Sequence, residues 1–324
     1  MRANQTVTSK DTRSEPQVPA ALGTRRRHTG SLDAGSHSSP SQFDIASREI
    51  SEKDFQCFQQ LIYRESGIWL SPAKTALLTG RIAKRIRHHG LKSFREYYRL
   101  VVENGDERIQ MLDAISTNET HFFREPKHFE LLRSTVFPEW VRKADMGRRV
   151  RRIRVLSAGC STGQEPYSLA MALLHHFPPA SGWEIEITAS DLSTRVLEIA
   201  KKGIWPAEKM HEIPPEYLKA FMLRGFGEHA GKIKAGPEIR SLIQFYRVNL
   251  NESLHLFSGK FDLIFCRNVL IYFNAQSREQ VVRRLASHLS DDGYFFVGHA
   301  ESLHQMGDVL STLVPTVYRP AQRS

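Results

Sequence analysis

Two patterns of hydrophobic and polar positions follow each other along the chain. From residue 44 to about residue 115, apolar side chains recur every three or four positions, and Phe55, Phe58, Leu61 and Ile62 are one such set. This spacing is typical of the buried face of an α-helix. Glycine and proline separate several runs of this kind, which favours short helices joined by turns. The pattern predicts a small all-helical domain over residues 44–115.

After residue 116, short apolar runs alternate with segments of helical periodicity. The candidate strands are residues 153–157, 184–189, 243–248, 261–266 and 294–297. Helices are expected to begin near Glu165 and Ser193, and another is expected around residues 281–289. Strands and helices that alternate at these lengths predict a mostly parallel sheet with helices on both faces. Residues 116–324 are therefore expected to form an α/β domain.

Two segments depart from these patterns. Residues 204–242 contain Pro214-Pro215, several glycines and many lysines, and we interpret them as an inserted subdomain. Residues 1–43 are rich in Ser, Thr, Gly, Pro and Arg and have almost no large apolar residue before Phe43. Such a segment cannot bury enough surface to offset the entropy lost on ordering, so we expect a disordered tail.

Composition narrows the function classes. The 324 residues include 45 Lys and Arg against 35 Asp and Glu, a formal charge of +10, which points to an acidic or polyanionic partner. No apolar run approaches the roughly 18–20 residues that span a bilayer, so no membrane insertion is expected. The cysteines Cys57, Cys160 and Cys266 are far apart, which suits a reducing compartment and predicts a cytoplasmic protein.

Neither the cysteines nor the histidines predict a metal site. The cysteines have no C-x-x-C spacing. The histidine pairs 88–89, 175–176 and His121/His128 share no helical face with acidic partners. No metal is therefore expected.

A glycine-containing loop stands between the first predicted strand and its helix. Residues 156–165 read Leu-Ser-Ala-Gly-Cys-Ser-Thr-Gly-Gln-Glu. A phosphate-binding P-loop would need Lys after the last glycine, where Gln164 stands, and the dinucleotide fingerprint G-x-G-x-x-G is absent. Glu165 at the helix start would also repel a pyrophosphate. A positively charged nucleoside without phosphates fits better, and S-adenosylmethionine is such a ligand.

Asp191 ends the second predicted strand and supports a nucleoside site. A carboxylate at that position can accept hydrogen bonds from ribose hydroxyls. It could equally serve as a cap for the helix that begins at Ser193, and the two roles are compatible.

The sequence resembles a known family, the CheR-type chemotaxis receptor methyltransferases. Residues 117–125, Thr-Asn-Glu-Thr-His-Phe-Phe-Arg-Glu, resemble its signature T-N-x-T-x-F-F-R-E. The family loop G-C-S-T-G-E-E-P-Y-S is found at residues 159–168, with Gln164 in place of the first glutamate. Further similar blocks occur in family order at residues 189–191, 248–250, 265–273 and 298–302.

The resemblance implies a Rossmann-like methyltransferase domain that uses S-adenosylmethionine and releases S-adenosylhomocysteine. It implies that the methyl donor is bound by Asn118, Thr120, Arg124, Glu165, Asp191, Asn249, Leu250, Arg267 and Asn268. The implied reaction is methylation of glutamate side chains on chemoreceptors, which serves sensory adaptation. The alternative is a methyltransferase that acts on RNA or another protein.

Two residues are implied to lie nearest the transferring methyl group, Arg124 and Tyr272. A glutamate carboxylate is ionised at neutral pH, so no general base is needed, and Arg124 could orient it. Arg124 could instead form a salt bridge with Glu125 or Glu165, and Tyr272 could be a buried aromatic at a strand end.

A basic helix is the candidate substrate surface. Between Lys74 and Arg99 eight basic residues stand against one acid, Glu96. The candidate substrate-binding residues are Arg81, Lys84, Arg85 and Arg87. A cationic face would attract the acidic methylation helix of a receptor. It could also be a plain solvated face, whereas nucleic-acid binding is not expected because no aromatics interleave with the basic residues. In some members of the family the inserted subdomain docks a receptor C-terminal peptide.

Overall fold

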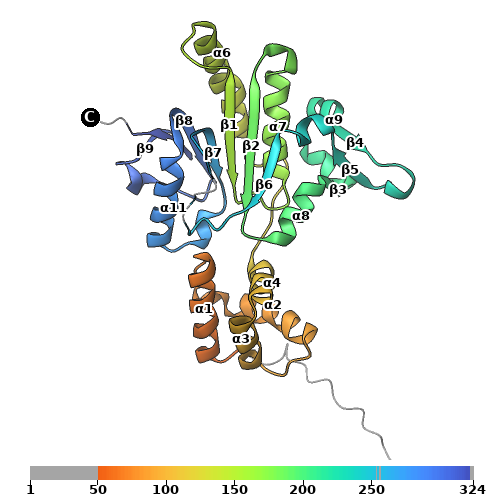
Figure 1. The fold of residues 1–324 in the computed structure, drawn as a ribbon, viewed down its shortest axis with the longest axis vertical. Coiled ribbons are helices and arrows are strands. Elements are labelled where there is room, and N and C mark those ends of the chain that lie inside the picture. The colour runs from red at the N-terminus through yellow and green to blue at the C-terminus, as the bar shows by residue number, and fades with distance from the viewer. Residues whose placement is uncertain (1–49, 253, 255–256, 322–324) are drawn as a thin grey trace, which may run out of the picture. The chain divides into compact units, whose positions relative to one another are not determined.

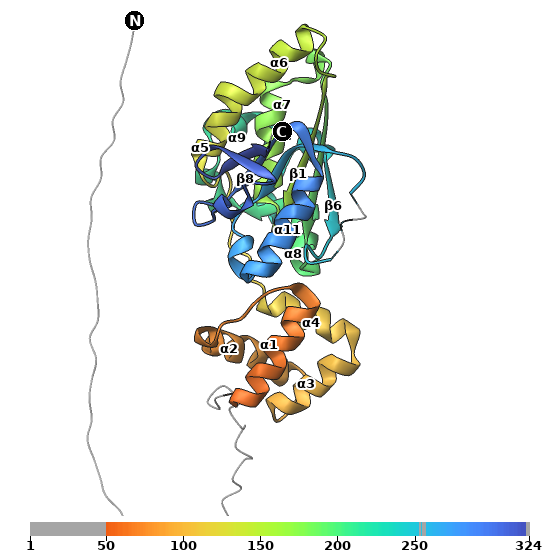
Figure 2. The same ribbon diagram turned by 90° about the vertical axis from the view of Figure 1, so that its left-hand side faces the viewer.

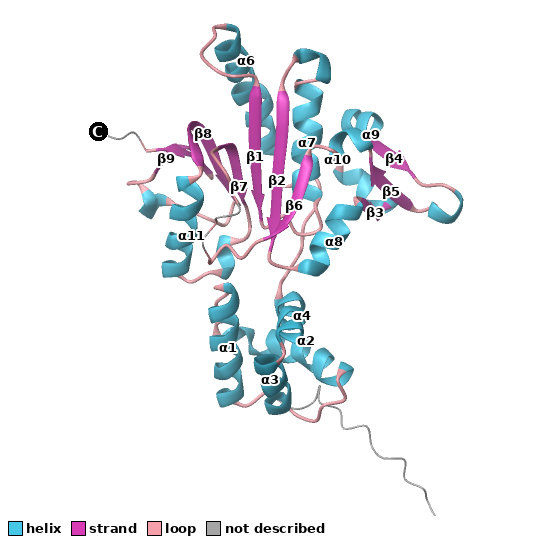
Figure 3. Ribbon diagram, in the orientation of Figure 1, coloured by secondary structure: helices cyan, strands magenta, loops and turns pink. Residues whose placement is uncertain are grey.

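The computed structural model describes residues 50–252, 254 and 257–321, and the predicted tail, residues 1–43, lies outside them. The first described part is purely helical (Figures 2 and 3). Its helices are α1 (Glu52–Ser66), α2 (Thr75–His88), α3 (Phe94–Glu103) and α4 (Gly105–Ile115). None of the helices among these described residues is long and apolar enough to cross a membrane.

Local sequence explains where these helices start and stop. The Ser51 and Ser93 side chains accept hydrogen bonds from the backbone N–H groups of Asp54 (3.1 Å) and Glu96 (3.2 Å), which caps α1 and α3. Gly67 ends α1 in the left-handed conformation, with φ of 74°. The apolar faces meet in one core, in which Phe58 packs on Tyr97 with ring centroids 6.1 Å apart.

The second part is built on a seven-stranded sheet in the order β6-β2-β1-β7-β8-β10-β9 (Figure 1). The strands are β1 (Arg152–Ala158), β2 (Glu184–Asp191), β6 (Ile243–Arg247), β7 (Phe261–Cys266), β8 (Leu289–Val297), β9 (Leu310–Val314) and β10 (Val317–Pro320). Strands β6, β2, β1, β7 and β8 are parallel, whereas β10 runs antiparallel to both β8 and β9. This agrees with the predicted mostly parallel sheet.

Helices cover both faces of this sheet because the central strands place buried apolar side chains on both sides of it. The helices are α5 (Pro126–Leu131), α6 (Phe137–Asp145), α7 (Gln164–His176), α8 (Thr194–Lys202) and α11 (Ala275–Ser287), and a π-helix (Leu132–Val136) joins α5 to α6. In β7, Leu263 and Phe265 face the core that includes α7, whereas Ile264 and Cys266 face the core that includes α11. This two-sided burial is what a parallel sheet requires.

A small subdomain lies in the predicted insertion, residues 204–242. It contains an antiparallel sheet in the order β3-β5-β4, from β3 (Ile204–Pro206), β4 (Met222–Arg224) and β5 (Lys232–Ala235). A 3-10 helix (Ala207–Glu212), α9 (Pro215–Phe221) and α10 (Pro237–Arg240) complete it. Trp205 packs edge-on against Tyr167 and Phe122, with ring centroids 5.0 Å apart in each case. These contacts join the subdomain to α7 and to the loop before α5.

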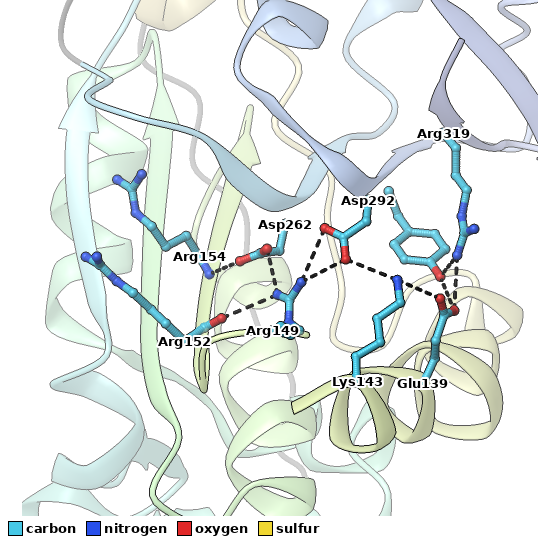
Figure 4. Close-up of polar contacts among 9 residues, drawn as sticks. Glu139, Lys143, Arg149, Arg152, Arg154, Asp262, Asp292 and Arg319 are labelled. Atoms are coloured by element: carbon cyan, nitrogen blue, oxygen red, sulfur yellow. Dashed lines mark hydrogen bonds and ion pairs between the residues drawn. The ribbon is translucent and has the colours of Figure 1, made fainter. Parts of the chain in front are cut away.

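The basic run 148–154, whose charge density is typical of a solvated linker, is partly buried in the structure. The Arg149 side chain is only 8% exposed, and it donates to Asp262 at 2.6 Å and to Asp292 at 3.2 Å (Figure 4). Its guanidinium lies over the Trp140 ring, 4.4 Å from the centroid. Arg154 lies in β1 and pairs with Glu186 at 3.1 Å. The ion pairs of this run therefore join α6 and the start of β1 to the first halves of β7 and β8.

Candidate functional site

A cavity of about 300 Å³ lies where the carboxyl ends of β1, β2, β6 and β7 meet the loop that follows α4. Ligands of open α/β sheets bind at this edge. Its lining includes all the predicted donor-binding and catalytic residues: Asn118, Thr120, Arg124, Glu165, Asp191, Asn249, Leu250, Arg267, Asn268 and Tyr272. The fold thus brings together residues that are far apart in the sequence.

The signature loop, residues 117–125, is held from several directions. The Asn118 carbonyl oxygen accepts from the Ser161 hydroxyl at 2.9 Å, and the Phe123 N–H donates to the Ser168 hydroxyl at 2.9 Å. The Phe122 N–H donates to a Glu212 carboxylate oxygen at 2.9 Å, so the inserted subdomain also supports the loop. Phe123 has φ of 49°, an uncommon left-handed conformation for a non-glycine residue. The loop conformation is therefore set by its contacts and not by local propensity.

The glycine loop, residues 159–163, makes close backbone approaches possible. Gly159 has φ of 84°, and a Cβ atom there would lie 2.3 Å from Val269 Cγ2, so only glycine fits. The backbone N–H groups of Gly159 and Cys160 both donate to the Ser190 carbonyl oxygen, at 2.7 and 2.9 Å. These bonds tie the loop to the end of β2 and keep it beside the cavity.

Asp191 is bound by backbone groups through both of its carboxylate oxygens. One accepts from the Ser161 N–H at 2.8 Å and the other from the Ser193 N–H at 2.9 Å. Ser193, not Asp191, caps α8, because its side chain accepts from the Val196 N–H. Burial raises the pKa of Asp191, although these backbone hydrogen bonds oppose the shift.

Arg267 is the buried cation of the site, with a side chain that is 1% exposed. Its guanidinium lies 3.3 Å from Glu125 and 3.6 Å from Glu165, and it donates to the Arg124 carbonyl oxygen. Glu165 also accepts from the Ser157 hydroxyl at 2.8 Å. Burial raises the pKa of Glu165, and Arg267 counteracts this shift. One arginine thus joins the signature loop to the start of α7.

Arg124 and Tyr272 both border the cavity. The Arg124 guanidinium donates to the Glu119 carbonyl oxygen at 3.2 Å, and no ion pair of Arg124 is found among the described residues. The salt bridges with Glu125 and Glu165 that were an alternative for Arg124 belong to Arg267 instead. Tyr272 is half-buried and lies in a 3-10 helix (Leu270–Tyr272), not at a strand end. Burial raises its pKa, so the phenol remains a hydrogen-bond donor at neutral pH.

The predicted substrate-binding residues on α2 do not line the cavity, whereas Lys74 does. Arg85 pairs with the buried Glu107, whose pKa is lowered to about 2 although burial opposes the shift. Arg81 donates to the Ile115 carbonyl oxygen and to the Thr117 hydroxyl, so it supports the start of the signature loop. Both guanidinium groups therefore have partners inside the protein.

Lys84 and Arg87 are the exposed members of this predicted set. Asn249 lines the cavity, but its side-chain amide donates to the Glu65 carbonyl oxygen at 2.8 Å and to Glu252 at 2.9 Å. Its side chain thus joins α1 to the loop after β6. The binding roles of Lys84, Arg87 and Asn249 stay predictions.

Sequence reasoning assigned no role to Glu301, which organises the loop after β7. Its carboxylate accepts from the backbone N–H groups of Gly298 at 2.6 Å, Asn268 at 2.8 Å and Ile271 at 3.2 Å. These bonds support Asn268 in a left-handed conformation, with φ of 60°. Glu301 stands in the block at residues 298–302, and that block was the only signal for it.

The cavity has the donors and acceptors that a charged nucleoside needs. Asn118 Nδ2 and Asn268 Oδ1 are buried and have no hydrogen-bond partner in the described part of the chain. A buried polar atom without a partner is costly, and a ligand with hydroxyl, amino or carboxylate groups would satisfy both. Glu165 and Asp191 are carboxylates that suit an ammonium group and ribose hydroxyls. The residues present therefore fit S-adenosylmethionine.

The comparison with protein families agrees with this chemistry. Residues 118–318 match the family described as "CheR methyltransferase, SAM binding domain", and residues 53–116 match "CheR methyltransferase, all-alpha domain". With its mostly parallel sheet and this cavity, the protein is an S-adenosylmethionine-dependent methyltransferase.

Similar proteins define this class of methyltransferase more narrowly. The chain is 37% identical over 276 residues to chemotaxis protein methyltransferase 2 of Pseudomonas aeruginosa, which covers 83% of this chain and 93% of that protein. It is 36% identical over 273 residues to the chemotaxis protein methyltransferase of Escherichia coli, with 83% and 91% covered. The chain belongs to the CheR methyltransferase family.

Proposed function

We propose that this protein transfers a methyl group from S-adenosylmethionine to glutamate side chains of chemoreceptors and so forms glutamate methyl esters. The observation that carries the proposal is the single cavity that gathers the predicted donor-binding residues together with Arg124 and Tyr272. The curated relatives are named chemotaxis protein methyltransferases, which supports a chemoreceptor as the acceptor. No observation favours RNA or an unrelated protein, and we place the reaction in the cytoplasm.

The donor site follows from the charges around the cavity. We assign Glu165 to the ammonium group of the donor and Asp191 to its ribose hydroxyls, because each offers carboxylate oxygens at the cavity. Asn118 and Asn268 would satisfy their unpartnered amide atoms on the ligand. When bound, S-adenosylmethionine supplies a methyl group on a sulfonium centre and leaves as S-adenosylhomocysteine.

The side chains at the cavity need only orient the acceptor. A glutamate has a pKa near 4.3, so its carboxylate is already the nucleophile at neutral pH and no general base is required. Arg124 can hold one carboxylate oxygen through a charge-assisted hydrogen bond. The Tyr272 phenol is protonated and can donate to the other oxygen. Orientation and exclusion of water are then the main contributions of the chain.

Lys74, Lys84 and Arg87 form the cationic surface that we propose for the acidic receptor helix. Lys74 lines the cavity and lies 5.5 Å above the Tyr272 ring, next to the proposed reaction centre. Lys84 and Arg87 lie on α2 and are exposed, so an acidic helix can reach them. Contacts of this kind raise the association rate and weaken with added salt. Arg81 and Arg85 would act indirectly, because they hold the signature loop and α4 in place.

The inserted subdomain offers a second contact for some receptors. Strand β4 is an edge strand of the β3-β5-β4 sheet, and Leu223 on it is 53% exposed. Phe226, which follows that strand, is 87% exposed. An extended peptide can add to such an edge by backbone hydrogen bonds, with apolar contacts for specificity. We therefore propose this edge for a receptor C-terminal peptide.

A labelling experiment tests the proposed function. Labelled S-adenosylmethionine would be incubated with the enzyme and receptor-containing membranes from the native organism, followed by mild base. We expect label on a receptor-sized band that mild base releases, because methyl esters hydrolyse under these conditions and N-methyl groups do not. Arg124→Ala should abolish the label. Base-stable label, or label on RNA, would contradict the proposal.

A further inference from the structure

Three potential metal ligands converge at the end of the signature loop, where Glu125 also faces Arg267 of the donor cavity. They are Glu125 Oε2, His128 Nδ1 and His299 Nε2, and all three atoms lie within 4.8 Å of one another. Glu125 Oε2 is 3.4 Å from His128 Nδ1 and 3.9 Å from His299 Nε2. Glu125 ends the signature loop, His128 lies on α5, and His299 lies in the turn after β8. The cluster thus joins three separate segments.

The hydrogen bonds of His128 determine which of its ring nitrogens is free. When the Thr316 hydroxyl donates to the Pro315 carbonyl oxygen at 2.6 Å, its oxygen can accept from His128 Nε2, which lies 2.8 Å away. The neutral ring then has its proton on Nε2, and Nδ1 presents a lone pair to the Glu125 carboxylate. Two acceptors that face each other repel unless a proton or a metal ion lies between them.

Burial makes this arrangement costly without a ligand. The side chains of Glu125 and His128 are 9% and 4% exposed, and neither Glu125 Oε2 nor His128 Nδ1 has a hydrogen-bond partner among the residues that the structure describes. The other Glu125 oxygen, Oε1, accepts from the His299 N–H at 3.0 Å, which fixes the carboxylate plane. Thr316 fixes the His128 ring in the way that outer partners orient metal-bound histidines.

Arg267 is the cation nearest to this cluster, 3.3 Å from Glu125 Oε2. Its other amino group faces Glu165 at 3.6 Å, so one guanidinium serves two carboxylates. Arg267 therefore compensates only part of the negative charge of Glu125 and Glu165, and a bound cation beside Glu125 is electrostatically acceptable.

We propose that Glu125, His128 and His299 form a binding site for a divalent transition-metal ion of the zinc type. Two imidazole nitrogens and one carboxylate oxygen are a donor set that zinc uses, with water at the fourth position. Donors about 2.0–2.1 Å from a tetrahedral ion lie about 3.4 Å from each other, close to the Glu125–His128 separation. The His299 side chain is 58% exposed and can turn toward the ion.

Such an ion would stabilise the local structure and would take no part in the reaction. It would fasten the end of the signature loop, next to Arg124, to the turn after β8 that also carries Glu301.

Cobalt(II) is the probe for this site because it absorbs visible light when bound tetrahedrally by nitrogen and oxygen. The tag-free full-length chain would be stripped with chelator, titrated with Co²⁺, and then titrated with Zn²⁺. We expect one equivalent of cobalt to give a visible band that zinc removes. His299→Ala should weaken cobalt binding by at least about tenfold, since even outer partners of metal ligands contribute that much.

His304→Ala is the matched control, because His304 is exposed in the same connection after β8 and outside the cluster. It should bind cobalt as the unaltered chain does. Glu125→Gln keeps the side-chain size and should also weaken binding, with circular dichroism used to verify folding. A chain that binds no cobalt, or a His299→Ala variant with unaltered affinity, would overturn the proposal.

Discussion

Arg267 donates a hydrogen bond to the backbone carbonyl oxygen of Arg124, so the residue that follows β7 positions the signature loop. The same guanidinium faces Glu125 and Glu165 and is almost fully buried. A planar group with several fixed N–H donors is needed for this geometry, which lysine cannot reproduce. The donor cavity and the proposed catalytic arginine therefore share one organising residue.

Arg267→Lys should reduce donor affinity although it keeps the charge. Loss of hydrogen bonds to charged groups costs about 1.5–3 kcal/mol, which corresponds to roughly tenfold to a hundredfold weaker binding. Calorimetric titration with S-adenosylhomocysteine measures this directly. Arg195→Lys, an exposed residue on α8, is the control and should bind normally. Equal affinity of Arg267→Lys and the unaltered chain would show that Arg267 does not organise the donor site.

Arg124→Ala and Tyr272→Phe should each lower the rate of methyl transfer. Donor binding should stay nearly intact in Tyr272→Phe, and in Arg124→Ala it should fall by less than the rate does, because Arg124 is also a predicted donor-binding residue. Each removes one group that we assign to the acceptor carboxylate, and loss of one such donor typically costs about 10²–10³ in kcat. Single-turnover transfer and donor titration separate the two effects. Lys127→Ala, exposed beside the same loop, should transfer methyl groups at the normal rate. A loss of donor affinity that accounts for the whole rate loss would contradict the assignment.

Gly159→Ala should abolish donor binding. The new Cβ would lie 2.3 Å from Val269 Cγ2, and φ of 84° is strained for alanine, so the glycine loop must move. Gly90→Ala is a matched control, because Gly90 has φ of 64° and open space around its Cα. It should lose only stability. Adding Val269→Ala to Gly159→Ala relieves the clash and should restore part of the binding; no recovery would argue against the steric explanation.

Arg149→Ala should destabilise the methyltransferase domain by about 3 kcal/mol, because it leaves the partly buried Asp262 without its main partner. Urea unfolding followed by circular dichroism gives the free energy of unfolding. Arg148→Ala removes a neighbouring exposed arginine and should change that free energy by less than about 0.5 kcal/mol. Similar losses for the two variants would mean that the run acts as the solvated linker that its charge suggests.

Because of Glu107, the free energy of unfolding of the helical domain should decrease as the pH becomes acidic. Burial alone would raise the pKa of Glu107, but hydrogen bonds from Arg85, Tyr97 and His89 lower it from 4.5 to about 2. The unfolded chain therefore takes up the proton first as the pH falls. The stabilisation is complete above pH 4.5 and is lost as the pH falls toward 2.

The comparison of the unaltered chain with Glu107→Gln measures this effect. The difference in the free energy of unfolding should be largest at neutral pH and should shrink below pH 4.5. Glu103→Gln, an exposed residue at the end of α3, should follow the unaltered chain at every pH. A difference between Glu107→Gln and the unaltered chain that stays constant with pH would contradict the lowered pKa.

The sequence alone predicted the five parallel strands and the main helices between them, in the order in which they occur. Strand β7 could be predicted because all its residues except Asp262 are apolar, and α3 because Ser93 precedes a helical repeat. The candidate donor residues could be predicted because the blocks that carry them resemble those of the CheR family. Local patterns suffice for these features, since they depend on side-chain periodicity and on backbone capping.

Only the tertiary structure decided which charges are buried and which residues meet. Arg149 and Arg85 look like solvated charges in the sequence, but Asp262 and Glu107 reach them from distant segments. His299 likewise reaches Glu125 and His128 only when β8 is placed in the sheet. The physical reason is that an ion pair or ligand set needs side-chain atoms a few ångströms apart. Long-range packing sets that distance, and no local spacing in the chain encodes it.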